Sequence, residues 1–111
     1  EQLIRLAPSS RLAAKTLEQL DAQYDLIINA SSAGLNGSAP DLPSRIIGAN
    51  SFCYDLSYSD SETPFLQWAS GLGAAHRADG FGMLIEQAAA AFRIWFGVSP
   101  DTAMVRTEML S

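Results

Sequence analysis

The chain has 111 residues, of which 48% are hydrophobic and 17% are charged. This length fits one small domain, and the apolar content is high enough to build a packed core. The formal net charge of −5, without any basic cluster, argues against binding to nucleic acid or to an anionic membrane surface. A single cysteine, Cys53, excludes an internal disulfide and favours a reducing, cytoplasmic location.

The first segment has a helical pattern that is already running at Glu1. Leu3, Ile4 and Leu6 have helical spacing, and Pro8 ends the pattern. A helix in this position implies a preceding strand that it connects to the sheet, so we expect the sequence to be a piece of a larger α/β protein. A capping-box spacing at Thr16 then predicts a very short helix over residues 17–22.

Two apolar runs predict strands. Residues 24–30 (YDLIINA) carry three adjacent apolar residues without alternation, which predicts a central strand covered on both faces. A loop rich in glycine, proline and asparagine follows, and residues 51–58 (SFCYDLSY) predict a second strand. Long, helix-containing connections between such strands indicate the α/β class with a parallel sheet.

Three helices are predicted in the second half. Thr63 and Pro64 have the residue types of an N-cap and a first helical position, and Gly71 and Gly73 end that helix. A polar loop containing His76 as a surface residue comes next. A longer helix is predicted over residues 82–96, with Gly97 as its C-terminal cap, and a last helix is predicted from Ser99-Pro100 to Leu110.

In open α/β sheets, ligands bind beyond the carboxyl ends of the strands, which here means residues 29–34 and 56–58. The NASSAG stretch (residues 29–34) offers an amide, two hydroxyls and a glycine, which suit a sugar or a phosphate. The same residue types also stabilise ordinary turns, so both interpretations stay open.

The helix after Asp79 has an unusual face. Gly80, Met83 and Gln87 share one stripe with Leu84, and the neighbouring Ala88, Ala91, Phe92 and Trp95 are predicted to lie in the core. An amide on an apolar face needs hydrogen-bond partners, which either a hydroxylated ligand or backbone groups could supply for Gln87.

Other catalytic interpretations are weaker. Ser31, Ser32, His76 and Asp55 could form a hydrolase triad, but no G-x-S-x-G elbow is present. Cys53 lies inside a strand and is interpreted as a small buried hydrophobe. The Gly-Phe-Gly at residues 80–82 lacks the third glycine of a dinucleotide fingerprint.

Four stretches resemble the C-terminal portion of the shikimate dehydrogenase family, and they come in the order and spacing of that family: residues 24–37, 40–43, 53–69 and 78–102. The resemblance implies the C-terminal half of a Rossmann-like, doubly wound parallel sheet followed by two C-terminal helices. Residues 1–79 would belong to the NADP-binding domain. Residues 80–111 would return to a substrate-binding domain that this chain does not contain.

The resemblance also implies an activity, the reversible reduction of 3-dehydroshikimate to shikimate with NADPH in aromatic amino acid biosynthesis. It assigns Tyr58 and Gln87 to the substrate. It assigns the cofactor site to Asn29, Ala30, Ser31, Leu56, Gly80 and Met83. Ser31 stands where the family commonly has threonine. The family's glycine-rich loop, its Asn-Arg-Thr segment and its catalytic lysine–aspartate pair have no match here, so we expect no catalytic residue in this chain and no activity from it alone.

Two alternatives remain at this stage. One is a quinate/shikimate dehydrogenase that prefers NAD, because the segment that selects the cofactor is not in the sequence. The other is a non-enzymatic binding module that keeps the fold. We also expect this chain alone to self-associate through an exposed strand edge and apolar surface.

Overall fold

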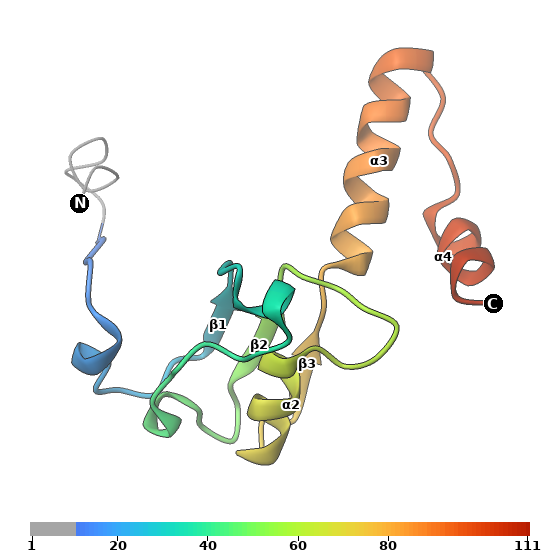
Figure 1. Ribbon diagram of the computed structural model, residues 1–111. Coiled ribbons are helices and arrows are strands. Elements are labelled where there is room, and N and C mark those ends of the chain that lie inside the picture. Colours follow the sequence, from blue (N-terminus) through green and yellow to red (C-terminus); the bar gives the residue numbers. More distant parts are fainter. Residues whose placement is uncertain (1–10) are drawn as a thin grey trace.

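The computed structural model describes residues 11–111, and the helical pattern predicted at residues 3–6 lies outside this range. Figure 1 shows a small sheet from which two helices extend. The regular elements are β1 (Leu26–Asn29), β2 (Phe52–Asp55), α2 (Pro64–Gly71), β3 (His76–Ala78), α3 (Phe81–Phe96) and α4 (Thr102–Leu110). Three short 3-10 helices lie at Leu17–Gln19, Ala33–Asn36 and Ser44–Ile46.

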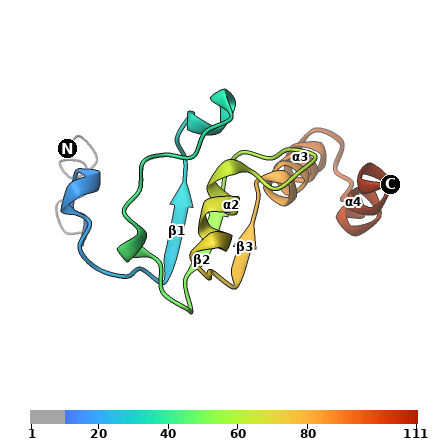
Figure 2. The ribbon, with the colours of Figure 1, turned by 60° about the horizontal axis from the view of Figure 1, so that its bottom comes forward.

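The three strands form one parallel sheet in the order β1-β2-β3. In register, Leu26 pairs with Phe52, and Phe52 pairs with His76. All three carboxyl ends therefore lie at the same edge of the sheet. Figure 2 shows the arrow of β1 pointing toward this edge. The predicted α/β class with a parallel sheet is confirmed.

Strand β3 contradicts the prediction of a polar loop around His76. Its three residues, His-Arg-Ala, are too few and too polar to give an apolar signal, because the strand lies at an edge of the described sheet. His76 is exposed, as predicted, and its ring stacks on Phe52 with centroids 6.3 Å apart. The strand is defined by its pairing with β2 rather than by its own residues.

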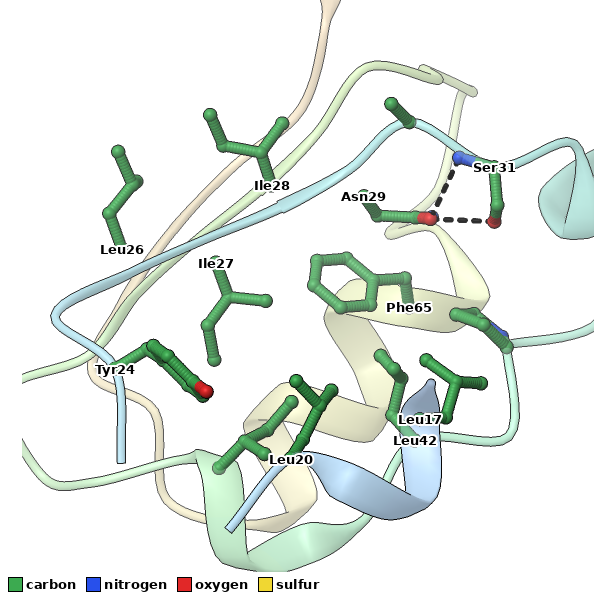
Figure 3. Close-up of a pocket in the computed structure, with 13 residues that line it drawn as sticks. Leu17, Leu20, Tyr24, Leu26, Ile27, Ile28, Asn29, Ser31, Leu42 and Phe65 are labelled. Atoms are coloured by element: carbon green, nitrogen blue, oxygen red, sulfur yellow. Dashed lines mark hydrogen bonds between the residues drawn. The ribbon is translucent and has the colours of Figure 1, made fainter. Parts of the chain in front are cut away.

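Only one face of this sheet is covered within the described residues. Helix α2 packs over the face that carries Ile27 and Cys53, and the buried core comprises Ile46, Ile47, Cys53, Phe65, Leu66, Ala69 and Ala74. On the opposite face Leu26 and Ile28 are 57% and 54% exposed. Figure 3 shows Ile27 directed toward Phe65 and these two side chains directed away. The prediction that residues 24–30 form a central strand covered on both faces is therefore wrong for this chain, because no described helix lies over the second face.

The helix boundaries follow their capping residues. Thr63 caps α2, with its hydroxyl accepting from the Leu66 amide at 3.4 Å, and Gly97 ends α3 with φ 69°, so both predictions are confirmed. Helix α4 begins at Thr102 rather than at Ser99-Pro100. Its cap is the Asp101 carboxylate, which accepts from two backbone amides at 3.0 and 3.1 Å and so satisfies the first turn.

Helix α3 leaves the sheet and extends away from it, and the chain then turns back so that α4 lies beside α3 (Figure 1). In α3 only Ile85 is buried, whereas Phe92 is 42% and Trp95 is 75% exposed. Ala88 is exposed and Ala91 is half-buried. The prediction that these residues lie in the core is wrong for this chain, because α3 makes its main contacts with α4 and leaves much of its apolar surface open.

Candidate functional site

Five of the eight predicted site residues lie where β1 and β2 end and α3 begins. Asn29 and Asp55 are the last residues of their strands and are paired in register. Ala30 and Leu56 follow directly, and Gly80 lies against Leu56. This edge is the place where open parallel sheets bind ligands.

The turn after β1 is held by the Asn29 side chain. Asn29 is buried, and its Oδ1 accepts hydrogen bonds from the Ser31 amide at 3.1 Å and the Ser31 hydroxyl at 2.7 Å (Figure 3). Ala30 and Ser31 themselves are exposed. Asn29 therefore stabilises the turn from inside, as the turn interpretation expects, while Ala30 and Ser31 form its outer surface.

Asp55 is a residue of this edge that the sequence interpretation did not assign to it. Its side chain is fully buried. Oδ1 accepts from the Ser57 amide at 3.0 Å and from Asn29 Nδ2 at 3.2 Å, and Oδ2 accepts from the Thr63 hydroxyl at 2.6 Å. The available signal was a carboxylate at a core-facing position of an apolar strand, since buried carboxylates are rare unless they are paired or hydrogen-bonded.

The start of α3 is packed closely against the end of β2. The Gly80 amide donates to the Ser57 carbonyl at 3.0 Å, and a Cβ placed on Gly80 would lie 2.1 Å from the Leu56 carbonyl oxygen. Only glycine permits this approach of the two backbones. The Leu56 amide in turn donates to the Asn29 carbonyl at 3.0 Å, so β1, β2 and α3 are joined at one point.

Three predicted residues lie farther along. The Tyr58 ring is exposed and rests near Phe81, with centroids 5.9 Å apart. Met83 and Gln87 lie one helical turn apart on α3, and both are exposed. Helix α3 therefore presents the Gln87 amide to solvent in this chain, whereas the sequence pattern placed it on an apolar face.

An apolar cavity of about 460 Å³ lies beside β1 and reaches Asn29 and Ser31 at one end. Figure 3 shows Tyr24, Ile27 and Phe65 directed into it. Among residues 11–111, its lining includes no carboxylate, imidazole or basic side chain. The only titratable side chain among the described lining residues is Tyr24, and no charged partner accompanies it there, so we assign the cavity no catalytic role.

The alternative chemistries find no support in the geometry. His76 and Asp55 lie at opposite ends of the strands, so they do not form a triad. Burial raises the pKa of the Cys53 thiol, an effect that the Arg77 guanidinium opposes, and the side chain is fully buried. Among residues 11–111, no three His, Cys, Asp or Glu side chains come together as a metal site. In the same part of the chain, no helix is long and apolar enough to span a bilayer.

Comparison with known proteins gives one consistent result. Residues 80–110 match the family described as Shikimate 5'-dehydrogenase C-terminal domain. Shikimate dehydrogenase (NADP(+)) of Alkalilimnicola ehrlichii is 46% identical over 106 residues, which is 95% of this chain and 39% of that protein.

Two solved structures have the same fold. An Ael1 enzyme from Pseudomonas putida superposes with a TM-score of 0.86 at 40% identity, over 99% of this chain and 42% of that one. Shikimate 5-dehydrogenase from Thermus thermophilus, in complex with NADP(H) and shikimate, gives a TM-score of 0.72 at 35% identity, over 90% and 38%. The chain thus spans about two-fifths of the length of the relatives that it matches.

Proposed function

The chain belongs to the shikimate dehydrogenase family, and we propose that it is the C-terminal segment of an NADP-dependent enzyme that reversibly reduces 3-dehydroshikimate to shikimate. The observation that carries the proposal is the convergence of Ala30, Ser31, Leu56 and Gly80 at the carboxyl edge of a parallel sheet. Below, the intact protein means the whole product of the gene that encodes this segment.

The surface at this edge suits a nicotinamide. Leu56 and Met83 are apolar and are 37% and 42% exposed, and the buried Gly80, which has no side chain, lies against the Leu56 carbonyl. Covering these apolar side chains with a flat ring removes them from water, which is favourable. The Ala30–Ser31 turn offers a polar surface next to them. Bound NADPH would supply the hydride that reduces the ketone carbon.

In this assignment the chain positions the cofactor and substrate but does not hold the acid–base pair. Tyr58 and Gln87 carry a hydroxyl and an amide, both exposed and therefore free to bind the hydroxyls and carboxylate of the substrate. The proton that completes the alcohol comes from a group outside this chain, as the resemblance implies. We therefore expect residues 1–111 alone to be inactive.

The division of the chain follows the same reasoning. We assign residues 1–79 to the NADP-binding domain and residues 80–111 to helices that return to the substrate-binding domain. The exposed Trp95 and Phe92 on α3 support this assignment, since such a surface is favourable only when covered. We place the enzyme in the cytoplasm, in keeping with its single, unpaired Cys53.

The test is an assay of the intact protein with 3-dehydroshikimate and NADPH. We expect consumption of NADPH that depends on 3-dehydroshikimate, and slower consumption of NADH. Preference for NADH and quinate would assign the protein to the quinate/shikimate dehydrogenases instead. Absence of any reduction, together with absence of NADP⁺ binding, would refute the proposed function.

A further inference from the structure

We propose that Asp55 is a positioning residue for the cofactor- and substrate-binding edge of this enzyme, acting through Asn29 and Ser57. The inference rests on the proposed function and adds to it a buried hydrogen-bond network that links Thr63, Asp55, Asn29 and Ser31. None of these contacts is needed to form the sheet, because the backbone pairing of β1 and β2 already joins Asn29 to Asp55.

The Asp55 carboxylate is buried, and none of its hydrogen-bond partners in the described part of the chain is a cation. Its relative exposure is 0%, and its partners are an amide, a backbone N–H and a hydroxyl. Burying a carboxylate is costly unless its oxygens accept hydrogen bonds, and here both oxygens do. An apolar residue would fill this core position at lower cost, so the carboxylate indicates a need for orientation.

One branch of the network sets the turn after β1. Asp55 Oδ1 accepts from Asn29 Nδ2 at 3.2 Å, and this contact directs the other end of the amide, Oδ1, toward Ser31. The Ser31 amide and hydroxyl both donate to that oxygen, at 3.1 and 2.7 Å. Asp55 therefore fixes the orientation of the Asn29 amide, and through it the shape of the Ala30–Ser31 surface.

The second branch sets the segment after β2. Asp55 Oδ1 also accepts from the Ser57 amide at 3.0 Å, and the Ser57 carbonyl accepts from the Gly80 amide at 3.0 Å. Ser57 lies between Leu56 and Tyr58, and Gly80 begins the helix that carries Met83 and Gln87. The same carboxylate is therefore connected to both groups of proposed ligand-binding residues.

Thr63 completes the arrangement. Its hydroxyl donates to Asp55 Oδ2 at 2.6 Å while its oxygen accepts from the Leu66 amide at 3.4 Å at the start of α2. The Asp55 carboxylate thus binds Ser57 and Thr63, the residues on either side of the loop over residues 58–62, which includes Tyr58. Loss of the Thr63 hydroxyl would leave a buried carboxylate oxygen without a donor.

The test compares variants of the intact protein. Thr63→Val removes the donor to Asp55, Thr63→Ser keeps it, and Asp55→Asn keeps the shape but changes the charge. Ser51→Ala is the matched control, because Ser51 is also buried and its hydroxyl donates to the Tyr24 carbonyl at 2.6 Å and accepts from the Gly48 amide at 2.9 Å. Ser51 lies at the amino-terminal end of β2, away from the proposed site.

We expect Thr63→Val to raise the dissociation constant for NADP⁺ and the KM for shikimate by about five- to tenfold. Hydrogen exchange of the ligand-free protein should become faster in peptides covering residues 29–32 and 56–60. Thr63→Ser should keep the dissociation constant, the KM and the exchange rates close to those of the wild-type protein. Ser51→Ala should lower the melting temperature to a similar extent while leaving the dissociation constant and the KM unchanged.

The inference is overturned if Thr63→Val lowers the melting temperature but binds NADP⁺ and shikimate like the wild-type protein. Should Thr63→Val fail to fold, Asp55→Asn decides the question in the same way, with weakened binding expected and wild-type binding as the contrary result. If the wild-type protein itself neither binds NADP⁺ nor reduces 3-dehydroshikimate, the proposed function fails and this inference fails with it. Normal wild-type binding with insensitive variants refutes the role of Asp55 alone.

Discussion

Replacing Gly80 with alanine tests the contact between α3 and β2 on which the candidate site depends. The added Cβ would lie 2.1 Å from the Leu56 carbonyl oxygen and 2.7 Å from its carbonyl carbon. Cβ atoms essentially never come closer than 3.0 Å to another heavy atom, so α3 must move away by about 1 Å. This movement also stretches the hydrogen bond from the Gly80 amide to the Ser57 carbonyl, now 3.0 Å long.

The expected cost follows from these two effects. Overpacking costs ~1–3 kcal/mol and the weakened hydrogen bond ~0.5–1.5 kcal/mol, so Gly80→Ala should lower the free energy of unfolding by about 2–4 kcal/mol. The Gly80 backbone, at φ −78°, suits alanine, so the loss comes from the contact and not from backbone strain.

The assay is urea unfolding of the intact protein, with Gly71→Ala as the matched control. A Cβ at Gly71 would meet nothing within 4 Å, so that variant should be neutral or more stable by ~0.5–1 kcal/mol. Gly80→Ala should also raise the dissociation constant for NADP⁺. Equal stability of the two variants would refute the close approach of α3 to Leu56.

Three further predictions concern other parts of the chain. Gln87→Ala should raise the KM for shikimate by about 5- to 150-fold, the equivalent of ~1–3 kcal/mol, and should not lower stability because the side chain is exposed. The control Gln67→Ala, on α2, should leave the KM unchanged. An unchanged KM for Gln87→Ala would show that Gln87 does not belong to the substrate site. Because Cys53 is buried and burial raises the pKa of its thiol, alkylation followed by peptide mapping should find Cys53 unmodified in the native protein and modified in urea. For the same reason the native state should lose stability as the pH rises past the ordinary thiol pKa. Alkylation of Cys53 in the native protein would contradict its burial. Residues 1–111 alone should self-associate through the open sheet face, which light scattering would detect. The double variant Leu26→Thr with Ile28→Thr should reduce this association, while the control Leu35→Thr, on the loop after β1, should not. A monomeric wild-type chain would contradict the prediction of self-association.

The parts of the fold that the sequence predicts are those with strong local causes. The capping pair Thr63-Pro64 predicted the start of α2, and the cap at Gly97 predicted the end of α3, because the effect of such caps depends on neighbouring residues only. The adjacent apolar residues of β1 and β2 indicated a parallel sheet for the same reason. These predictions needed no knowledge of distant contacts.

The errors arose where distant contacts decide the structure. Strand β3 consists of His-Arg-Ala and exists because β2 pairs with it, so its own residues carry no signal. Trp95 looked like a core residue from its chemistry alone, but its exposure depends on what packs against α3. Asp55 was considered only as a triad member, since its bonds to Asn29 and Thr63 span 26 and 8 positions of sequence.

In the proposed function, this chain forms the cofactor- and substrate-binding edge of an NADP-dependent shikimate dehydrogenase. The most direct measurement is NADPH oxidation by the intact protein with 3-dehydroshikimate as substrate, for the wild type and for Gln87→Ala. We predict activity that requires 3-dehydroshikimate and falls strongly in the variant at low substrate concentration. An intact protein that folds, yet neither oxidises NADPH in the presence of this substrate nor binds NADP⁺, would contradict the claim.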